Sequence, residues 1–300
     1  MLRSNSKFLK ITLLALTIVL FIAYYLNNRG AFGRISDLSI IQVCLILAGQ
    51  SLVLIANTIT LYVIVAFFQK RIPPSAAARV TAYSSLINFF GFLQGGVGFR
   101  GVYLKKYYSI ELKKYFLVTF VQYLILFAMA GLLIFIGTGL ISGIKTALFF
   151  TFLAILSAAT LFFILRSTNI SSKLSTRFKG VGFVFHSKKV LLLGCSVCLQ
   201  LLGSLIAYGV ALDAIGAHIT LGGLLIFTGI SQFSIVIALT PGALGIREGL
   251  LLIAQNQLLL STSDIIVAST IDRIVYFITL ALLVPLALRV RKENNSQLKP

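Results

Sequence analysis

The chain has 300 residues, of which 58% are hydrophobic and 11% are charged, and its mean hydropathy is +1.01. Soluble domains hold about 45–50% apolar and about 25% charged residues, so this composition excludes an ordinary soluble protein and predicts a polytopic membrane protein. A formal charge of +19 would favour nucleic-acid binding in a soluble protein. Here Lys and Arg lie between apolar segments, as the positive-inside rule expects, which argues against nucleic acid as a partner.

The sequence contains no convincing metal, redox or nucleotide motif. Cys195 and Cys198 form a C-x-x-C pattern inside an apolar run, and Cys44 lies in another. Without a thioredoxin-like or zinc-ribbon context, these cysteines are interpreted as small apolar residues. His186 and His218 stand alone, and no P-loop pattern occurs, so we expect no metal, no cofactor and no use of ATP by the chain itself.

The first half of the chain predicts two spans and a hairpin. Residues 8–26 form an apolar span whose basic flank stays in the cytoplasm, and residues 38–68 form a second span. Residues 75–94 are also apolar, but a single crossing there would place four following lysines outside the cell, against the positive-inside rule. A re-entrant hairpin that turns at a glycine cluster keeps them inside. The glycines and lysines are Gly95, Gly96, Gly98, Lys105, Lys106, Lys113 and Lys114.

The second half predicts another hairpin, entering from the outside. Residues 115–136 and 146–165 are predicted spans, and the basic segment 166–189 after them lies in the cytoplasm. The remaining predicted segments are a span at 190–212, an apolar segment at 219–239 that enters from outside, a break at 240–245, a return at 246–260 and a final span at 265–288.

These segments predict an all-α polytopic membrane protein with about six full spans and two re-entrant or broken-helix hairpins, about eight to nine apolar segments in all. We expect it in the cell membrane (inner or plasma membrane), with both termini in the cytoplasm. A pair of full spans gives the same sidedness as a hairpin, so the depth of the two hairpins stays open. The sequence does not indicate an oligomeric state.

The two hairpins share a pattern that suggests an inverted repeat. Gly98-Phe99-Arg100 and Gly245-Ile246-Arg247 lie about 150 residues apart, and the flanking spans repeat at nearly the same offset. The prediction is one membrane domain, 1–300, with repeat 1 at 38–136, a connecting span and basic loop at 137–189, and repeat 2 at 190–289. Inverted repeats with interrupted helices are typical of secondary transporters. The alternative is two unrelated glycine-rich packing motifs.

The most informative stretch is the break in the second hairpin. Pro241, Gly242 and Gly245 free the backbone from helical geometry at membrane depth, so this segment must line a protein-enclosed or wet cavity. An ionisable residue at such a depth costs about 2.5–3.5 kcal/mol on insertion scales. Arg247 and Glu248 are therefore candidate functional residues.

The glycine turns predict an anion site. A helix that begins after each turn points its positive end inward, and Arg100 or Arg247 in its first turn adds a guanidinium that holds phosphate with two hydrogen bonds. Asp272 and Arg273 lie within the final span. We expect Glu248 to meet Arg273 or Arg100, and not its neighbour Arg247. This pair either counterbalances an empty anion site or simply locks the helices together.

The two motifs also resemble a known family. The segment Pro241-Gly242-x-x-Gly245-x-Arg247-Glu248, followed by a final span with Arg273 and Pro285, closely resembles the second half of the lysylphosphatidylglycerol synthase/flippase transmembrane-domain family. The first-half motif of that family is similar to Gly95-Gly96-x-Gly98-x-Arg100 with the following Tyr103-Leu104-Lys105-Lys106. The resemblance covers nearly the whole chain. Members often carry a proline and an acidic residue in the first motif, where this chain has Gln94 and Phe99.

The resemblance implies a flippase-like membrane domain that moves a phospholipid or a lipid-linked sugar across the bilayer. In full-length synthases a soluble domain performs aminoacyl transfer; this chain ends at Pro300 soon after its last span, so we expect no enzyme activity. The expected binding residues are Arg100, Arg247, Glu248, Asp272 and Arg273, and the expected partner is a membrane lipid with an anionic headgroup. Two alternatives stay open: a non-catalytic partner of a cell-envelope glycosyltransferase or lipid synthase, and a membrane-embedded lipid transferase.

Overall fold

The computed structural model describes residues 26, 29–90, 95–143, 148, 188–236 and 240–296, without the side chains of residues 31 and 283–296. The span predicted at 8–26 and most of the connecting segment 137–189 lie outside the described residues. Every regular element in the described part is a helix, and no strand occurs there. The helices are α2 (Arg29–Gly33), α3 (Ile40–Phe67), α4 (Pro74–Phe90), α5 (Gly95–Tyr108), α6 (Leu112–Ser142), α10 (Lys189–Ala214), α11 (Leu221–Val236), η1 (Pro241–Ala243), α12 (Ile246–Ile253), α13 (Gln255–Leu258) and α14 (Thr262–Ser296).

Four of these helices are long and apolar enough to cross a membrane: α3, α6, α10 and the Thr262–Leu282 part of α14. They contain 28, 31, 26 and 21 residues, and at about 1.5 Å per residue each reaches the roughly 30 Å thickness of a bilayer core. The protein is therefore an all-α polytopic membrane protein, as the sequence predicted. Helix α6 continues through Ser142, past the predicted span end at residue 136. Gly137 and Gly139 do not end it, because Gly137 packs closely against Gly222 of α11, and the helix ends only at Gly143.

Local sequence explains where these helices begin and end. Ser39 caps α3 through a capping box, in which its Oγ accepts from the amide of Gln42 at 3.2 Å and Gln42 Oε1 accepts from the amide of Ser39 at 3.0 Å. Pro74 begins α4, where its missing N–H costs nothing. Gly143 follows α6 with a φ of 84°, a conformation that glycine adopts without steric cost.

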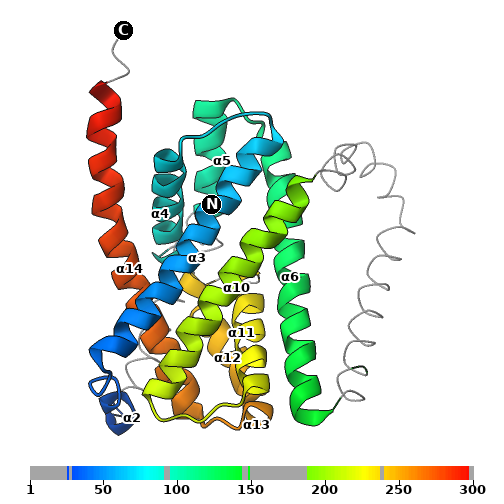
Figure 1. Cartoon of the computed structure of the whole chain (residues 1–300), viewed down its shortest axis with the longest axis vertical. Coiled ribbons are helices and arrows are strands. Elements are labelled where there is room, and N and C mark those ends of the chain that lie inside the picture. The colour runs from blue at the N-terminus through cyan, green and yellow to red at the C-terminus, as the bar shows by residue number, and fades with distance from the viewer. Residues whose placement is uncertain are drawn as a thin grey trace, which may run out of the picture.

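Two helical hairpins occupy opposite halves of the molecule. Helices α4 and α5 lie together in the upper half of Figure 1, and α11, α12 and α13 lie in the lower half. Helix α4 has 17 residues, α5 has 14 and α11 has 16, or about 21–26 Å each, so none reaches across a bilayer core of about 30 Å. The hairpins thus reach inward from opposite ends. The repeat relation between the two halves stays a prediction.

Small residues bring the long helices close together. A Cβ at Gly49 of α3 would lie 2.7 Å from the carbonyl oxygen of Gly203 in α10, and a Cβ at Gly203 would lie 2.6 Å from that of Gly49. Gly137 of α6 and Gly222 of α11 leave equally little room for a side chain. Close approach at small residues is the usual way for membrane helices to gain packing contacts, because lipid tails are as apolar as the side chains.

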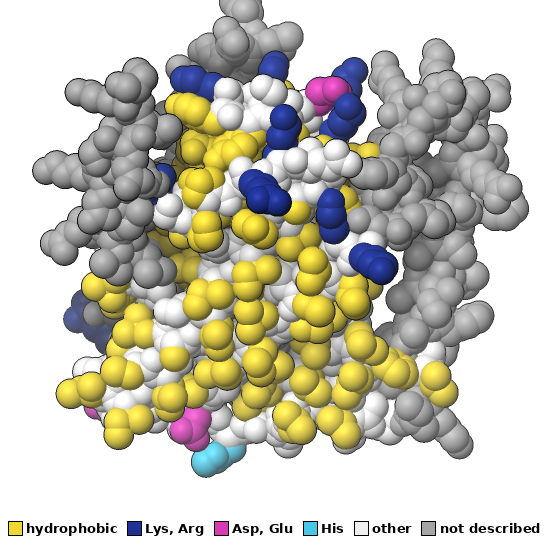
Figure 2. Space-filling model, turned by 45° about the horizontal axis from the view of Figure 1, so that its top comes forward, with side chains coloured by type: hydrophobic (Ala, Val, Ile, Leu, Met, Phe, Trp, Pro, Cys, Tyr) yellow, Lys and Arg dark blue, Asp and Glu magenta, His cyan; other side chains and the backbone are white. Residues whose placement is uncertain are grey.

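Charged side chains gather at one end of the molecule, which we call the basic end. Figure 2 shows Lys and Arg over its upper face and an apolar surface below them. The described Lys and Arg residues at the basic end, at the termini of α3, α5, α6 and α10, are Lys70, Arg71, Lys105, Lys106, Lys113, Lys114, Lys188 and Lys189. The opposite end holds Arg29, Arg34, Asp37, Asp213, His218 and Asp264. This asymmetry is the one that the positive-inside rule describes.

Candidate functional site

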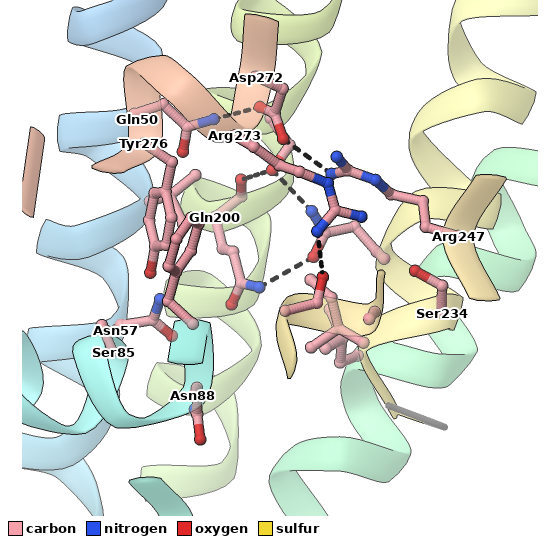
Figure 3. A pocket seen from close by; sticks show the side chains of 18 of the residues that line it. Gln50, Asn57, Ser85, Asn88, Gln200, Ser234, Arg247, Asp272, Arg273 and Tyr276 are labelled. Carbon is pink, nitrogen blue, oxygen red and sulfur yellow. Dashed lines mark hydrogen bonds and ion pairs between the residues drawn. The ribbon is translucent and has the colours of Figure 1, made fainter. Parts of the chain in front are cut away.

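A polar cavity of about 180 Å³ lies where the tips of the two hairpins meet the long helices. Both hairpins contribute to its wall, and so do α3, α6, α10 and α14. The tips touch: a Cβ placed on Gly242 would lie 3.5 Å from the carbonyl oxygen of Phe89. The cavity therefore lies where the tips of the two hairpins, which come from opposite ends of the described part of the molecule, meet (Figures 1 and 3).

The second hairpin breaks where the sequence predicted. Gly242 and Gly245 have φ values of 55° and 82°, in the left-handed region that favours glycine. Helix α12 begins directly after Gly245, whose amide donates to Glu248 Oε2 at 2.8 Å. Pro241, Gly242 and Gly245 thus form the break itself, and Arg247 and Glu248 lie in the first turn of the helix that follows.

The glycines of the first hairpin act differently from the prediction. Gly95, Gly96 and Gly98 all lie within α5 and do not form its turn. A Cβ at Gly96 would collide with the carbonyl oxygen of Ser84 in α4, and the Gly96 amide donates to Asn88 Oδ1 at 2.7 Å. Gly96 is therefore needed for close helix packing, whereas a Cβ at Gly98 would meet nothing within 4 Å.

Arg247 is neutralised inside the protein. Its guanidinium pairs with Asp272, with 2.7 Å between Nη1 and Oδ2, and donates to Tyr208 Oη at 3.2 Å and to the carbonyl oxygen of Ser269 at 3.0 Å. Gln50 donates to the other oxygen of Asp272. Arg247 is only 7% exposed, so the pair and its hydrogen bonds satisfy charges that would be costly to bury alone.

Glu248 pairs with Arg273, as predicted, with 2.8 Å between Oε1 and Nη2. Arg273 also donates to the carbonyl oxygen of Gly242 at 2.9 Å, which ties α14 to the broken hairpin. The expectation that Glu248 avoids Arg247 is wrong, because Arg247 Nε lies 3.6 Å from Glu248 Oε1. Both side chains turn toward α14, and their length closes the gap between adjacent helix positions. Glu248 itself does not line the cavity and acts on it through Arg273.

We call this side of the cavity the paired wall. Its members are Gln50, Tyr208, Arg247, Asp272 and Arg273, together with Glu248, which pairs with Arg273 but does not itself line the cavity.

Arg100 differs from the other two arginines. It lines the cavity, is 7% exposed, and forms no ion pair with any carboxylate of the described residues. Its Nε is buried and has no hydrogen-bond partner in the described part of the chain, which is also true of Arg247 Nε, so the missing carboxylate is what sets Arg100 apart. The expectation that Arg100 lies in the first helical turn is wrong: Gly95 is already helical, so Arg100 lies in the second turn, where the dipole of α5 adds less. Arg100 still contributes its own positive charge to the cavity.

Several carboxamides line the cavity beside Arg100, and the sequence reading did not single them out. Asn57 and Gln122 form no hydrogen bond with the described residues, and Gln200 Oε1 is buried without a partner there. Gln200 instead donates through Nε2 to Gln232 Oε1 at 2.9 Å. Amides in the middle of apolar spans were the signal that could have revealed them.

We call Asn57, Arg100, Gln122 and Gln200 the open wall. In Figure 3, Gln50, Asp272 and Arg273 lie on one side of the cavity, and Asn57, Ser85 and Asn88 lie on the other.

The fold and this cavity define the class of the protein: a polytopic helical membrane protein with a charged, amide-lined cavity between two opposed hairpins. The described residues contain no group of three or more His, Cys, Asp or Glu side chains placed to hold a metal. Comparison of the chain with family models, with curated proteins and with solved structures finds no match.

Proposed function

We propose that the protein is a flippase-like lipid translocase that moves a lipid with an anionic headgroup across the cell membrane. The observation that carries the proposal is Arg100, a buried cation in the cavity wall without a carboxylate partner among the described residues. A buried, unpaired guanidinium is costly, and a phosphate that accepts two of its hydrogen bonds removes that cost. The resemblance to the lysylphosphatidylglycerol synthase/flippase transmembrane-domain family supports the same function.

The charge balance of the cavity favours an anion. Arg100, Arg247 and Arg273 bring three positive charges, and Asp272 and Glu248 compensate two of them. One positive charge remains, on Arg100, which pairs with no carboxylate of the described residues. A single negative charge on a lipid phosphodiester would complete the balance.

The position of the cavity supports movement across the bilayer. The hairpins that form it reach inward from opposite ends, so a shift of either tip would connect the cavity to one side. We infer from the basic end that the cytoplasm lies there. The cytoplasmic position of both chain termini stays a prediction from the sequence.

The test is lipid movement in proteoliposomes that contain only the purified protein and a fluorescent analogue of phosphatidylglycerol. Arg100→Gln is expected to slow movement about tenfold, because it removes a charge-assisted hydrogen bond to the phosphate. Lys105→Gln, which removes an exposed positive charge from the same helix, is the matched control and should stay within about twofold of wild type.

Equal rates for Arg100→Gln and wild type would remove the assignment of the site. No movement by the wild-type protein would favour a non-catalytic partner of another membrane enzyme, since the vesicles contain no second protein. Chemical conversion of the labelled lipid would instead identify a transferase.

A further inference from the structure

Four charged side chains join the tip of the second hairpin to α14 in a crossed arrangement, which we call the crossed quartet. Helix α12 carries Arg247 and Glu248 at adjacent positions, and α14 carries Asp272 and Arg273 at adjacent positions. Arg247 pairs with Asp272 at 2.7 Å. Glu248 pairs with Arg273 at 2.8 Å. Each helix therefore contributes one positive and one negative charge, so each side of the contact is neutral by itself.

The two arginines of the crossed quartet also make the other polar contacts between the tip and α14. Arg247 donates to the carbonyl oxygen of Ser269 at 3.0 Å, and Arg273 donates to that of Gly242 at 2.9 Å. Within the described part of the chain, every side-chain hydrogen bond between residues 240–253 and α14 involves one of these arginines. Charged groups thus hold the tip on α14 (Figure 3).

The packing of α12 differs between its two ends. Leu251, near the C-terminal end, is fully buried in the apolar core that also contains Ile265 of α14. Toward the tip, a Cβ placed on Gly245 or Gly249 would meet nothing within 4 Å. Helix α12 is therefore anchored at one end by apolar contacts and has free space at the other, as a pivoting element requires.

A second set of pairs is available within each helix. Arg247 Nε lies 3.6 Å from Glu248 Oε1 and has no hydrogen-bond partner among the described residues, so it is free to bond to Glu248. On α14, Asp272 and Arg273 already interact electrostatically. If the tip moved away from α14, each carboxylate would keep an arginine of its own helix as its partner. No charge would then be left unpaired at a depth where an unpaired charge is costly.

From this arrangement we propose that the crossed quartet is a two-state ion-pair switch. Its charges pair between the helices when the tip is closed and within each helix when the tip has moved away from α14. The inference rests on the proposed translocase function and identifies the second hairpin as the element that opens the cavity toward the end opposite the basic end. The first hairpin has no equivalent switch among the described residues, because Arg100 pairs with no carboxylate there.

Four double variants separate this switch from a static contact. Each variant removes one arginine and one carboxylate, so the net charge of the site does not change. Two crossed variants remove one pair between the helices: Arg247→Gln with Asp272→Asn, and Glu248→Gln with Arg273→Gln. Two same-helix variants remove both charges of one helix: Arg247→Gln with Glu248→Gln, and Asp272→Asn with Arg273→Gln.

The measurement is access to the cavity from the end opposite the basic end. In a background that lacks Cys44, Cys195 and Cys198, Ser85→Cys places a thiol in the cavity wall on the first hairpin, outside the crossed quartet. Ser85 is only 7% exposed, so the thiol reacts when the cavity opens. The membrane-impermeant anion sulfonatoethyl methanethiosulfonate is added on that side alone, and its rate of reaction with the full-length protein in membranes is measured by mass spectrometry.

Crossed variants are expected to react about tenfold more slowly than the unsubstituted quartet, because opening would leave one unpaired charge on each helix. Same-helix variants are expected to react severalfold faster, because no pair between the helices remains and the two charges left share one helix. A static contact predicts that crossed variants also react faster, since one of two pairs is gone. That result, or no reaction from this side in any variant, would overturn the proposal.

Controls cover folding and unspecific effects. Glu111→Gln with Lys114→Gln removes an exposed ion pair at the basic end and should react within about twofold of the unsubstituted quartet. Thermal unfolding in detergent identifies the folded variants, and one folded variant of each kind is sufficient for the comparison.

The thiol reaction also separates the switch from the function that it rests on. The expected order of rates in a protein that moves no lipid would uphold the switch and reject the translocase. Lipid movement by the crossed variants at the wild-type rate would keep the translocase and reject the switch.

Discussion

The three arginines of the cavity differ in whether a neighbouring carboxylate pairs with them. Arg247 and Arg273 each meet a carboxylate within 2.8 Å, whereas Arg100 meets none among the described residues. Burial makes the difference in free-energy cost large, because a paired charge is compensated inside the protein and an unpaired one is not. We therefore assign the binding role to Arg100 and a balancing role to the paired wall.

Substitution of Glu248 tests whether the Glu248–Arg273 pair balances the charge of an empty anion site or only holds the helices together. Glu248→Gln removes the negative charge and leaves Arg273 free to hold a second phosphate oxygen. We expect anionic lipid to bind about tenfold more tightly and to move severalfold more slowly, because release from the cavity becomes harder. Lipid binding by native mass spectrometry and movement in proteoliposomes measure the two effects.

Glu111→Gln serves as the control, because Glu111 forms an exposed pair with Lys114 at the basic end. It should change neither binding nor movement. A Glu248→Gln protein that unfolds more easily but binds lipid with unchanged affinity would show that the pair only locks the helices.

Residue chemistry in the sequence identified the charged members of the site and one of their two ion pairs, Glu248 with Arg273 or Arg100, but not the pair of Arg247 with Asp272. Arg247, Glu248, Asp272 and Arg273 were evident because each lies in an apolar stretch, where ionisable groups are costly. Which arginine takes which carboxylate depends on how α12 and α14 pack, and no local pattern encodes that contact. The carboxamides were overlooked because single amides alter the hydropathy of a span very little.

Short helices are the elements on which the site depends. Helices α5 and α12 begin in the cavity region because the chain turns there, and each needs a glycine for a different reason. Gly245 provides a left-handed backbone conformation at the start of α12, and Gly96 lets α5 touch α4. Long spans surround both and hold them in place.

The first hairpin offers a matched pair of substitutions. Gly96→Ala should destabilise the protein by about 1–3 kcal/mol, because its Cβ meets the backbone of α4, which cannot move aside like a flexible side chain. Gly98→Ala, on the same helix with open space around it, should be neutral or slightly stabilising. Thermal unfolding in detergent measures both; equal stability of the two variants would contradict the close packing of α4 and α5.

At the scale of elements the sequence predicted most of the fold. The second predicted span, 38–68, corresponds to α3 at Ile40–Phe67, and the break at 240–245 coincides with η1 and the turn after it. Prediction was less successful for α6, whose apolar sequence continues past the predicted end. The structure also divides the predicted return 246–260 into α12 and α13 at Ala254, where the sequence has no glycine or proline.

The whole molecule is asymmetric in charge, and this predicts its orientation. In a background that lacks Cys44, Cys195 and Cys198, Lys70→Cys at the basic end should react with a membrane-impermeant maleimide only from the cytoplasmic side. His218→Cys, at the opposite end, should react only from outside. Labelling of both positions from one side would contradict the opposed arrangement of the two ends.

The central claim is that hairpin tips from opposite ends jointly close one headgroup site, and cross-linking tests it most directly. In the same cysteine-free background, Phe89→Cys and Ala243→Cys place thiols on the two tips, which are in contact in the structure. A short, reducible bifunctional methanethiosulfonate should join them and stop lipid movement, and reduction should restore it. The pair Phe89→Cys and His218→Cys should not react. Failure of the tip pair to cross-link, or unchanged lipid movement by the cross-linked protein, would contradict the account.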